Sequence, residues 1–168
     1  MPYHFRDATL ADLPAIVAIY NATIPSRMVT ADLHPVSVGS RQAWFDAHAP
    51  EHRPLWVVSA SEQTDTDILG WLSFSDFYGR PAYAATVEVS IYLAEAARGK
   101  GFGRLFLQRA LAAAPGLAVH TVLGFIFGHN EASRRLFRAE GFSDWGVLPA
   151  VASLDGVERD LVIMGRRL

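Results

Sequence analysis

The sequence predicts a single α/β domain (α+β in the broader sense) over residues 1–168, with a mixed central β-sheet flanked by helices. Three observations predict this class. Segments with helical and with strand-like apolar periodicity alternate along the chain, and no linker divides them. The length suffices for one hydrophobic core without disulfides or metals. Hydrophobic residues make up 51% and charged residues only 19%, which is typical of a folded domain.

The first expected helix covers Thr9 to Asn21, where apolar side chains recur every three or four residues. Two N-caps compete: Thr9, with Asp12 three residues later, or Asp12 itself. The second choice is preferred because it places Pro14 in the first turn, where the missing N–H costs least. After a polar loop containing several prolines, a second helix is expected over residues 38–48.

The clearest strand covers residues 86–93. Aliphatic side chains occupy every second position, so Glu88, Ser90 and Tyr92 share the opposite face. Further helices are expected at 102–114, ended by Pro115 and Gly116, and at 131–140, stopped by Gly141. The other strand-like segments are residues 55–60 and 68–74 (joined by a polar hairpin turn at 61–67), 118–127, 142–147 and 159–164.

Composition and charge argue against several classes of function. A net charge of −2 does not favour nucleic acid as a partner, because such binding uses many Lys and Arg contacts to phosphates. The chain has no cysteine, which excludes disulfides and thiolate sites. No apolar run is long enough to span a bilayer, and the N-terminus lacks signal-peptide features. We expect a cytoplasmic protein without membrane partners. The histidines His34, His48, His52 and His120 have no ligand spacing, so no metal is expected.

A glycine-rich segment, Arg98-Gly99-Lys100-Gly101-Phe102-Gly103, lies between the clearest strand and a helix. Glycines at alternate positions let the backbone turn tightly and approach a ligand. Backbone N–H groups at a helix start, with two basic side chains beside them, suit a pyrophosphate. Taken alone, the segment also fits an ordinary turn, because it lacks the Gly-Lys-Ser/Thr ending of a P-loop and the acidic partner of a dinucleotide fold.

The surrounding motifs narrow the interpretation. A strand, Arg98-x-x-Gly101-x-Gly103 and an amphipathic helix together resemble the acetyl-CoA-binding signature of the GNAT superfamily of N-acetyltransferases. Asn130-x-x-Ser133-x-x-Leu136-Phe137-x-x-x-Gly141-Phe142 resembles the second conserved block of that superfamily. Residues 15–21, 80–83, 86–92 and 160–164 resemble its phosphinothricin acetyltransferase branch, which acetylates the α-amine of phosphinothricin and methionine sulfoximine. The resemblance extends from Phe5 to Met164.

The resemblance implies acetyl-CoA as co-substrate, bound between splayed central strands, and no metal. The backbone of one strand would pair with the pantetheine arm, the glycine-rich segment would hold the pyrophosphate, and two polar residues would lie near the reacting end. The implied acetyl-CoA-binding residues are Ile91, Tyr92, Leu93, Arg98, Gly99, Lys100, Gly101, Phe102, Gly103, Arg104, Asn130 and Ser133.

Acetyl transfer needs a neutral amine, so a base is useful near neutral pH. Glu88 is the candidate, because it is the lone carboxylate within an apolar strand and family members carry Glu here. Without the resemblance to the family, Glu88 would be interpreted as a carboxylate on the solvated face of a half-exposed strand. His129 and Asp76 are rivals. Phe137 stands where many GNAT enzymes have a Tyr that protonates the thiolate, so water, Tyr92 or Tyr83 would have to replace it.

By resemblance, an amino-acid-like small molecule would bind near Asn21, Arg80 and Tyr83, with Arg80 pairing its carboxylate. Asn21 also fits a helix C-cap, and Arg80 and Tyr83 also fit a rim loop. Residues 151–159 depart from the aromatic pattern of the branch. Close relatives imply a homodimer. The alternatives are acetylation of protein N-termini or of a polyamine, or a CoA-binding sensor without catalysis.

Overall fold

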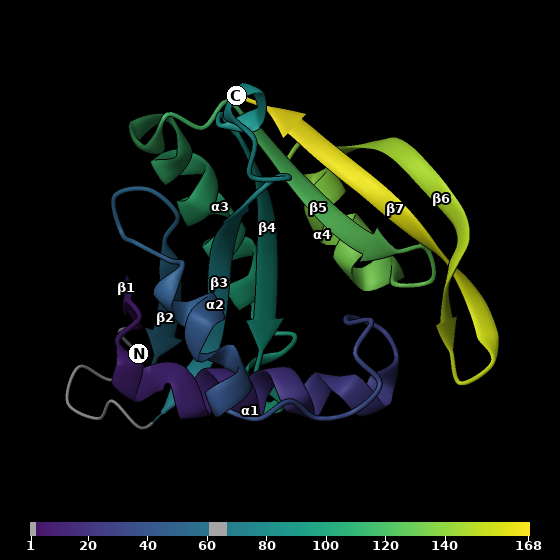
Figure 1. Cartoon of the computed structure of the whole chain (residues 1–168), viewed down its shortest axis with the longest axis horizontal. Helices are drawn as coiled ribbons and strands as arrows, with labels where there is room; N and C mark the ends of the chain where they lie inside the picture. The colour runs from purple at the N-terminus through teal and green to yellow at the C-terminus, as the bar shows by residue number, and fades with distance from the viewer. Residues whose placement is uncertain (1–2, 61–66) are drawn as a thin grey trace.

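The computed structural model describes residues 3–60 and 67–168, so all but the last residue of the expected turn at 61–67 lies outside the described residues. Seven strands form one sheet in the order β1-β2-β3-β4-β5-β7-β6 (Figure 1). The strands are β1 His4–Asp7, β2 Leu55–Ser59, β3 Ile68–Asp76, β4 Thr86–Leu93, β5 Thr121–Phe127, β6 Ser143–Leu154 and β7 Val157–Arg167. The helices are α1 Leu13–Thr23, α2 Gln42–Asp46, α3 Phe102–Ala113 and α4 Glu131–Ala139.

The sheet is mixed, because β4 and β5 are parallel while all other neighbours are antiparallel. The parallel pairing joins Thr86–Glu88 to residues 121–123 and then stops. Beyond Glu88, β4 stays paired with β3 and β5 stays paired with β7, so the two central strands separate (Figure 1). The predicted splayed centre of a mixed sheet is thereby confirmed.

Helices cover both faces of the sheet. On one face, α3 and α4 pack on Val87, Val89 and their neighbours in the larger core cluster. On the other face, Ile16 and Ile19 of α1 pack against Trp71, whose indole Nε1 donates to the Ile16 carbonyl at 3.1 Å. The alternation of β4 therefore separates a core face from a face that can hold a ligand.

Asp12 occupies the N-cap position of α1, as preferred, but its side chain makes no capping hydrogen bond to the helix. Its carboxylate turns back instead, accepting from the Thr9 N–H at 2.7 Å and pairing with Arg6 at 2.7 Å. This is the other alternative, in which Thr9 and Asp12 close the helix start together. Pro14 does lie in the first turn of α1.

Three elements differ most from the sequence-based expectation. Strand β1 was not predicted, because four residues are too few to show a period. The hairpin of β6 and β7 is longer than predicted, since its outer half is exposed on both faces and carries no apolar alternation. Only residues 42–46 of the expected second helix are α-helical, after a 3₁₀ turn at 39–41.

Candidate active site

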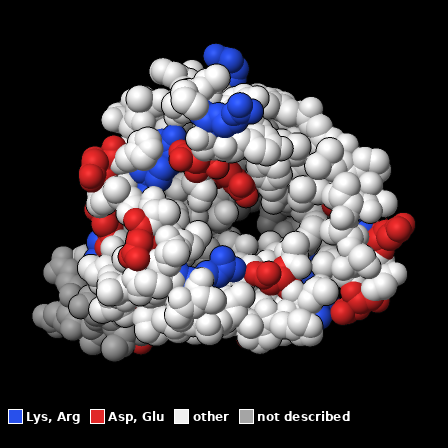
Figure 2. Space-filling model, viewed as in Figure 1, with Lys and Arg blue, Asp and Glu red and all other residues white. Residues whose placement is uncertain are grey.

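A cavity of about 220 Å³ lies between α1, α2 and the ligand-facing side of β3 and β4. Figure 2 shows this face of the molecule hollowed, with side chains of both charges around the hollow. Its lining residues are Ile16, Val17, Tyr20, Val36, Arg41, Trp44, Trp71, Ser73, Ser75, Glu88, Ser90 and Tyr92. We call this space the acceptor cavity.

The floor of the acceptor cavity consists of cross-strand pairs of β3 and β4. The pairs are Trp71 with Tyr92, Ser73 with Ser90, and Ser75 with Glu88. All six side chains point away from the α3 face because residues two apart on a strand share a side. The floor therefore changes from aromatic at one end to hydroxyl and carboxylate at the other.

Glu88 is the carboxylate in this floor. Burial raises the pKa of its carboxyl above the usual range, because the charged form is poorly solvated there. A carboxylate with a raised pKa is a better proton acceptor. Burial, and the nearby Tyr20 and Glu88, also raise the pKa of Tyr92, so its hydroxyl keeps its proton at neutral pH. The cavity thus contains a carboxylate that can accept a proton and a neutral hydroxyl that can donate a hydrogen bond.

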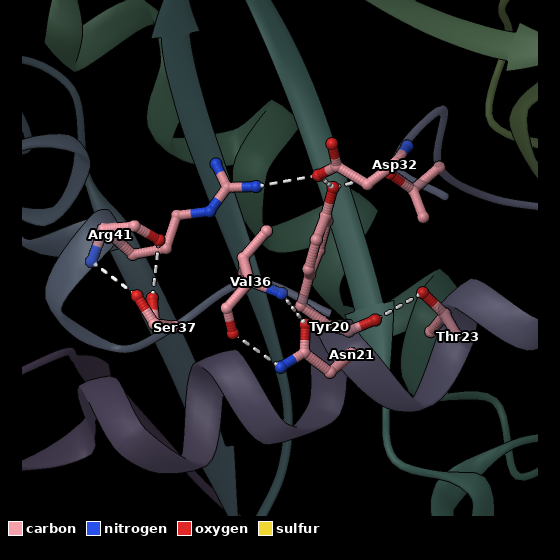
Figure 3. A network of polar contacts seen from close by, with 9 residues as sticks. Tyr20, Asn21, Thr23, Asp32, Val36, Ser37 and Arg41 are labelled. Atoms are coloured by element: carbon pink, nitrogen blue, oxygen red, sulfur yellow. Dashed lines mark hydrogen bonds and ion pairs between the residues drawn. The ribbon is translucent and has the colours of Figure 1, made fainter. Parts of the chain in front are cut away.

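The opposite wall comes from the loop between α1 and α2 and its polar contacts (Figure 3). The Tyr20 hydroxyl bonds to Thr30 Oγ1 at 2.5 Å and to the Asp32 carboxylate. Asp32 also pairs with Arg41, whose Nη2 lies 3.1 Å from Oδ2. The Arg41 guanidinium lies over the Tyr20 ring at 4.9 Å. The Arg41 guanidinium is therefore held in the acceptor cavity, and its remaining N–H groups can bind a ligand.

Arg41 is a candidate that sequence reasoning missed. It lies in a 3₁₀ turn before α2, so it shows no strong motif. The available signal was its spacing from Trp44 and His48, which places all three on one face of the expected helix. The ring of His48 packs on Trp44 at 4.8 Å, and its Nδ1 lies 2.8 Å from the Trp44 carbonyl.

The three predicted acceptor residues do not line the cavity. Asn21 lies within α1, and its carboxamide exchanges two 2.9 Å hydrogen bonds with the backbone of Val36 (Figure 3). It is thus not a helix C-cap, and it holds a cavity-lining residue; its contact with the acceptor stays a prediction. Arg80 and Tyr83 lie exposed in the loop between β3 and β4, where Tyr83 packs on Phe77 at 5.4 Å. The structure therefore brings Arg41, rather than Arg80, to the cavity.

The two rivals of Glu88 are engaged elsewhere. The Asp76 carboxylate pairs with Arg53 at 2.6 Å. His129 Nε2 donates to the Arg27 carbonyl at 2.9 Å, and its ring stacks on Phe127 at 5.6 Å. Neither residue lines the acceptor cavity. Of the three candidate bases, only Glu88 faces it.

The glycine-rich segment can accommodate a pyrophosphate. Gly99 and Gly101 have φ of 71° and 85°, and a Cβ on either would meet no atom within 4 Å. Both therefore turn the chain sharply beside open space. The Arg98 Nε donates to the Leu93 carbonyl at 3.3 Å, which places this cation beside the end of β4. N–H groups of the first turn of α3 lack helical partners and add donors.

Other residues of this segment also make contacts within the protein. The Phe102 side chain is buried in the core against the Tyr3 ring, so only its backbone can reach a ligand. A Cβ on Gly103 would meet Leu136 at 3.1 Å, so this glycine allows α3 to pack on α4. Arg104 is exposed but pairs with Glu140 at 2.7 Å. Lys100 is exposed, as a phosphate contact requires.

The edge of β4 can pair with an extended ligand where β5 has separated. The Ala94 N–H donates to the Leu69 carbonyl on β3 at 2.8 Å. Peptide groups alternate in direction along a strand, so those of Ile91 and Leu93 face the gap. Those of Tyr92 face β3 instead, which corrects the expectation that its backbone joins the pantetheine arm. Its side chain lines the acceptor cavity.

Asn130 and Phe137 contribute to the fold. The Asn130 carboxamide oxygen caps α4 by accepting from the Ser133 N–H at 3.2 Å, and its Nδ2 donates to the Met28 carbonyl at 3.1 Å. Each end of the carboxamide can still make one further hydrogen bond, so the contacts of Asn130 and Ser133 with the CoA arm stay predictions. Phe137 is buried against Phe142, with ring centroids 4.8 Å apart.

Replacing Gly101 by Val is expected to weaken acetyl-CoA binding at least about tenfold, measured by calorimetry on the folded variant. The added side chain would fill the open space beside the α3 start and block backbone approach. Gly156→Val is the matched control, because Gly156 has φ of 81° and equally open surroundings at the tip of the β6–β7 hairpin. Equal acetyl-CoA affinity in the two variants would contradict the assigned site.

Within the described residues, no helix is long and apolar enough to cross a bilayer. No three His, Asp or Glu side chains in the same part of the chain come together as a metal-binding group. The pyrophosphate cradle, the open β4 edge and the acceptor cavity are therefore the features to be compared with known proteins.

The comparisons agree with this geometry. The acetyltransferase (GNAT) domain family matches residues 4–143. YwnH of Bacillus subtilis (strain 168), provisionally named a phosphinothricin acetyltransferase, is 52% identical over 163 residues, covering 97% of this chain and 98% of that protein. An L-methionine sulfoximine/L-methionine sulfone acetyltransferase of Pseudomonas paraeruginosa (strain DSM 24068 / PA7) is 36% identical over 164 residues, with 98% and 94% covered.

A solved structure shows the same fold. It is a GNAT-superfamily phosphinothricin acetyltransferase from Sinorhizobium meliloti in complex with AcCoA, with a TM-score of 0.91 and 31% identity. The match covers 100% of this chain and 89% of that one. The predicted fold and acetyltransferase class are confirmed: the chain belongs to the GNAT family of acetyltransferases.

Proposed function

We propose that the protein transfers the acetyl group of acetyl-CoA to the α-amine of a small amino acid of the phosphinothricin or methionine sulfoximine/sulfone type. The observation that carries this proposal is a single small cavity that holds both the Glu88 carboxylate and the Arg41 guanidinium. One group suits the amine and the other suits the carboxylate of an amino acid. The names of the similar enzymes support the same acceptor class.

The reaction proceeds by direct attack of the amine nitrogen on the thioester carbonyl. Glu88, directly or through water, takes the proton that the nitrogen must lose, because a protonated amine has no lone pair to attack with. The C–N bond forms, the C–S bond breaks, and the thiolate leaves. The thiolate takes up a proton from water, and Tyr92, which keeps its own proton and faces the same cavity, is better placed than Tyr83 to donate a hydrogen bond to it.

Ligand contacts follow from the same geometry. The peptide groups of Ile91 and Leu93 bind the extended arm of acetyl-CoA along the β4 edge. The segment 98–103 holds the pyrophosphate through backbone N–H groups, with Arg98 and Lys100 adding charge. At about 220 Å³ the acceptor cavity is smaller than the roughly 300 Å³ at the lower end of typical ligand pockets, which favours a compact acceptor over a peptide.

A substrate panel tests the proposal. Thiol release from acetyl-CoA is measured with phosphinothricin, methionine sulfoximine, methionine sulfone, their amides, a dipeptide and a polyamine. We expect the free amino acids to be turned over in preference to the rest. Fast turnover of peptides or polyamines would favour those acceptors instead. Binding of acetyl-CoA without turnover of any amine would favour a CoA-binding sensor.

We also propose that two copies of the chain form a homodimer through β6. This strand is at the edge of the sheet, so one side of its backbone has no strand partner in the described chain. Its hairpin exposes large apolar side chains, which are Trp145, Val147, Leu148, Val151 and Val157. Light scattering should give twice the 18.4 kDa of one chain, and Val151→Asp should lower that mass. A wild-type mass of one chain would contradict the dimer.

Because acetyl-CoA is an intracellular metabolite, we propose a cytoplasmic location.

A further inference from the structure

The loop between α1 and α2 forms a wall of the acceptor cavity without secondary structure of its own. Residues 27–38 contain neither helix nor strand. Yet Asp32 in this loop bonds to Tyr20 and pairs with Arg41, and Val36 lines the cavity. The position of these groups therefore depends on side-chain contacts that hold the loop.

Arg27 stands at the start of this loop. Its φ of 56° ends the helical turns that follow α1 and reverses the chain. The guanidinium then bonds in two directions. Its Nη1 donates to the Leu33 carbonyl at 3.0 Å and to the Ile24 carbonyl at 3.3 Å, across the base of the loop. Its Nε and Nη2 lie 2.8 and 3.2 Å from the two carboxylate oxygens of Asp155.

Asp155 lies at the tip of the β6–β7 hairpin, far away in the sequence. The Arg27 hydrogen bonds lower the pKa of the Asp155 carboxyl, so the pair stays charged at neutral pH. The Arg27 carbonyl accepts from His129, and the Met28 carbonyl accepts from Asn130. The start of the loop is thus bound both to the hairpin tip and to the turn between β5 and α4.

These contacts lead to the cation in the cavity. The bond from Arg27 to the Leu33 carbonyl fixes the peptide between Leu33 and residue 34, one residue beyond Asp32. Asp32 in turn holds Arg41 at 3.1 Å. The second anchor of the loop is the pair of hydrogen bonds between Asn21 and Val36. Arg27 is the anchor at the other end.

We propose that Arg27 is a positioning residue for the acceptor cavity. It joins the loop to the tip of the β6–β7 hairpin and thereby keeps Asp32 and Arg41 where an acceptor carboxylate binds. The link to the acceptor rests on the proposed function; the link to the loop does not. An exposed ion pair by itself contributes little, because solvent screens it. Most of the effect comes from the bond that Arg27 makes to Leu33, and the Asp155 pair orients the guanidinium for it.

The kinetic test compares Arg27→Ala, Arg27→Lys and the matched control Arg109→Ala, which removes an exposed arginine on α3. Arg27→Ala should raise the KM for the amino-acid acceptor about tenfold, because a displaced cavity wall misplaces the acceptor. The KM for acetyl-CoA and the Tm should not change. Arg27→Lys keeps the charge but not the forked geometry and should fall between wild type and Arg27→Ala. Arg109→Ala should behave as wild type.

Amide hydrogen exchange of the protein without ligands supplies an independent readout. Exchange of residues 27–38 should become about tenfold faster in Arg27→Ala, with β2 and β3 unchanged. Asp155→Asn, which tolerates the φ of 53° at this turn, should give a smaller change in the same direction. Unchanged loop exchange, or faster exchange with an unchanged acceptor KM, overturns the proposal. If wild type acetylates no amino acid but loop exchange responds, the proposed function fails and the loop anchor stands.

Discussion

Replacing Glu88 by Gln is expected to lower kcat by about 10²-fold at pH 7, the usual scale for loss of a general base. The amide keeps the size of the side chain in the acceptor cavity but cannot accept the proton of the amine. Acetyl-CoA affinity should change little, because the glycine-rich segment lies elsewhere. Fixed-time assays of thiol release, with both substrates at saturating concentration, measure the change in kcat. The loss should shrink at high pH, where the amine deprotonates without help.

The pH profile gives the same test a second readout. Burial raises the pKa of Glu88, so its carboxyl holds a proton to a higher pH than a free Glu does. Activity should therefore fall as the pH drops through this raised pKa, and Glu88→Gln should lack that acid limb. Ser90→Ala, a neighbour on the same strand face, is the control and should keep the limb. Full activity of Glu88→Gln at pH 7 would show that Glu88 is only structural.

Replacing Arg41 by Ala is expected to lower kcat/KM for the amino-acid acceptor by about 10²-fold, because the acceptor carboxylate would then be left without its charged donor. The guanidinium uses one nitrogen for Asp32 and lies over Tyr20, so its other N–H groups remain for a carboxylate. Arg41→Lys should recover little, since an ammonium cannot make the paired contacts.

Substrate discrimination separates this role from a general loss of folding. Wild type should prefer the free amino acid to its amide, and Arg41→Ala should lose that preference while acetyl-CoA binding stays intact. The parallel variant Arg80→Ala changes an exposed loop residue that does not line the cavity. We expect it to retain the preference. If Arg80→Ala loses it and Arg41→Ala does not, the carboxylate binds at the loop between β3 and β4.

Much of the fold could be predicted because it depends on local patterns. The alternation of residues 86–93 sets both the bounds of β4 and the face that Glu88 shares with Ser90 and Tyr92, and the structure agrees with both. Gly101 and Gly141 have positive φ at the start of α3 and after α4, as residues without a Cβ permit. Strand β1 was missed because four residues show no period, and the outer half of the β6–β7 hairpin was missed because it is exposed and carries no apolar alternation.

The sequence by itself determined the fold class and the face on which Glu88 lies, because residue spacing within a strand or helix has a fixed geometric consequence. The GNAT family was indicated by the resemblance of several motifs along the chain, and the pyrophosphate role of the glycine-rich segment rests on the same resemblance. Only the tertiary structure decided which side chains meet around the acceptor. The cavity joins β3 and β4 to a loop without regular structure, and the position of that loop depends on Arg27, Asp32 and Asn21. Contacts of this kind leave no period in the sequence. The sequence therefore pointed to Arg80, and only the folded structure identified Arg41 as the arginine that lines the cavity.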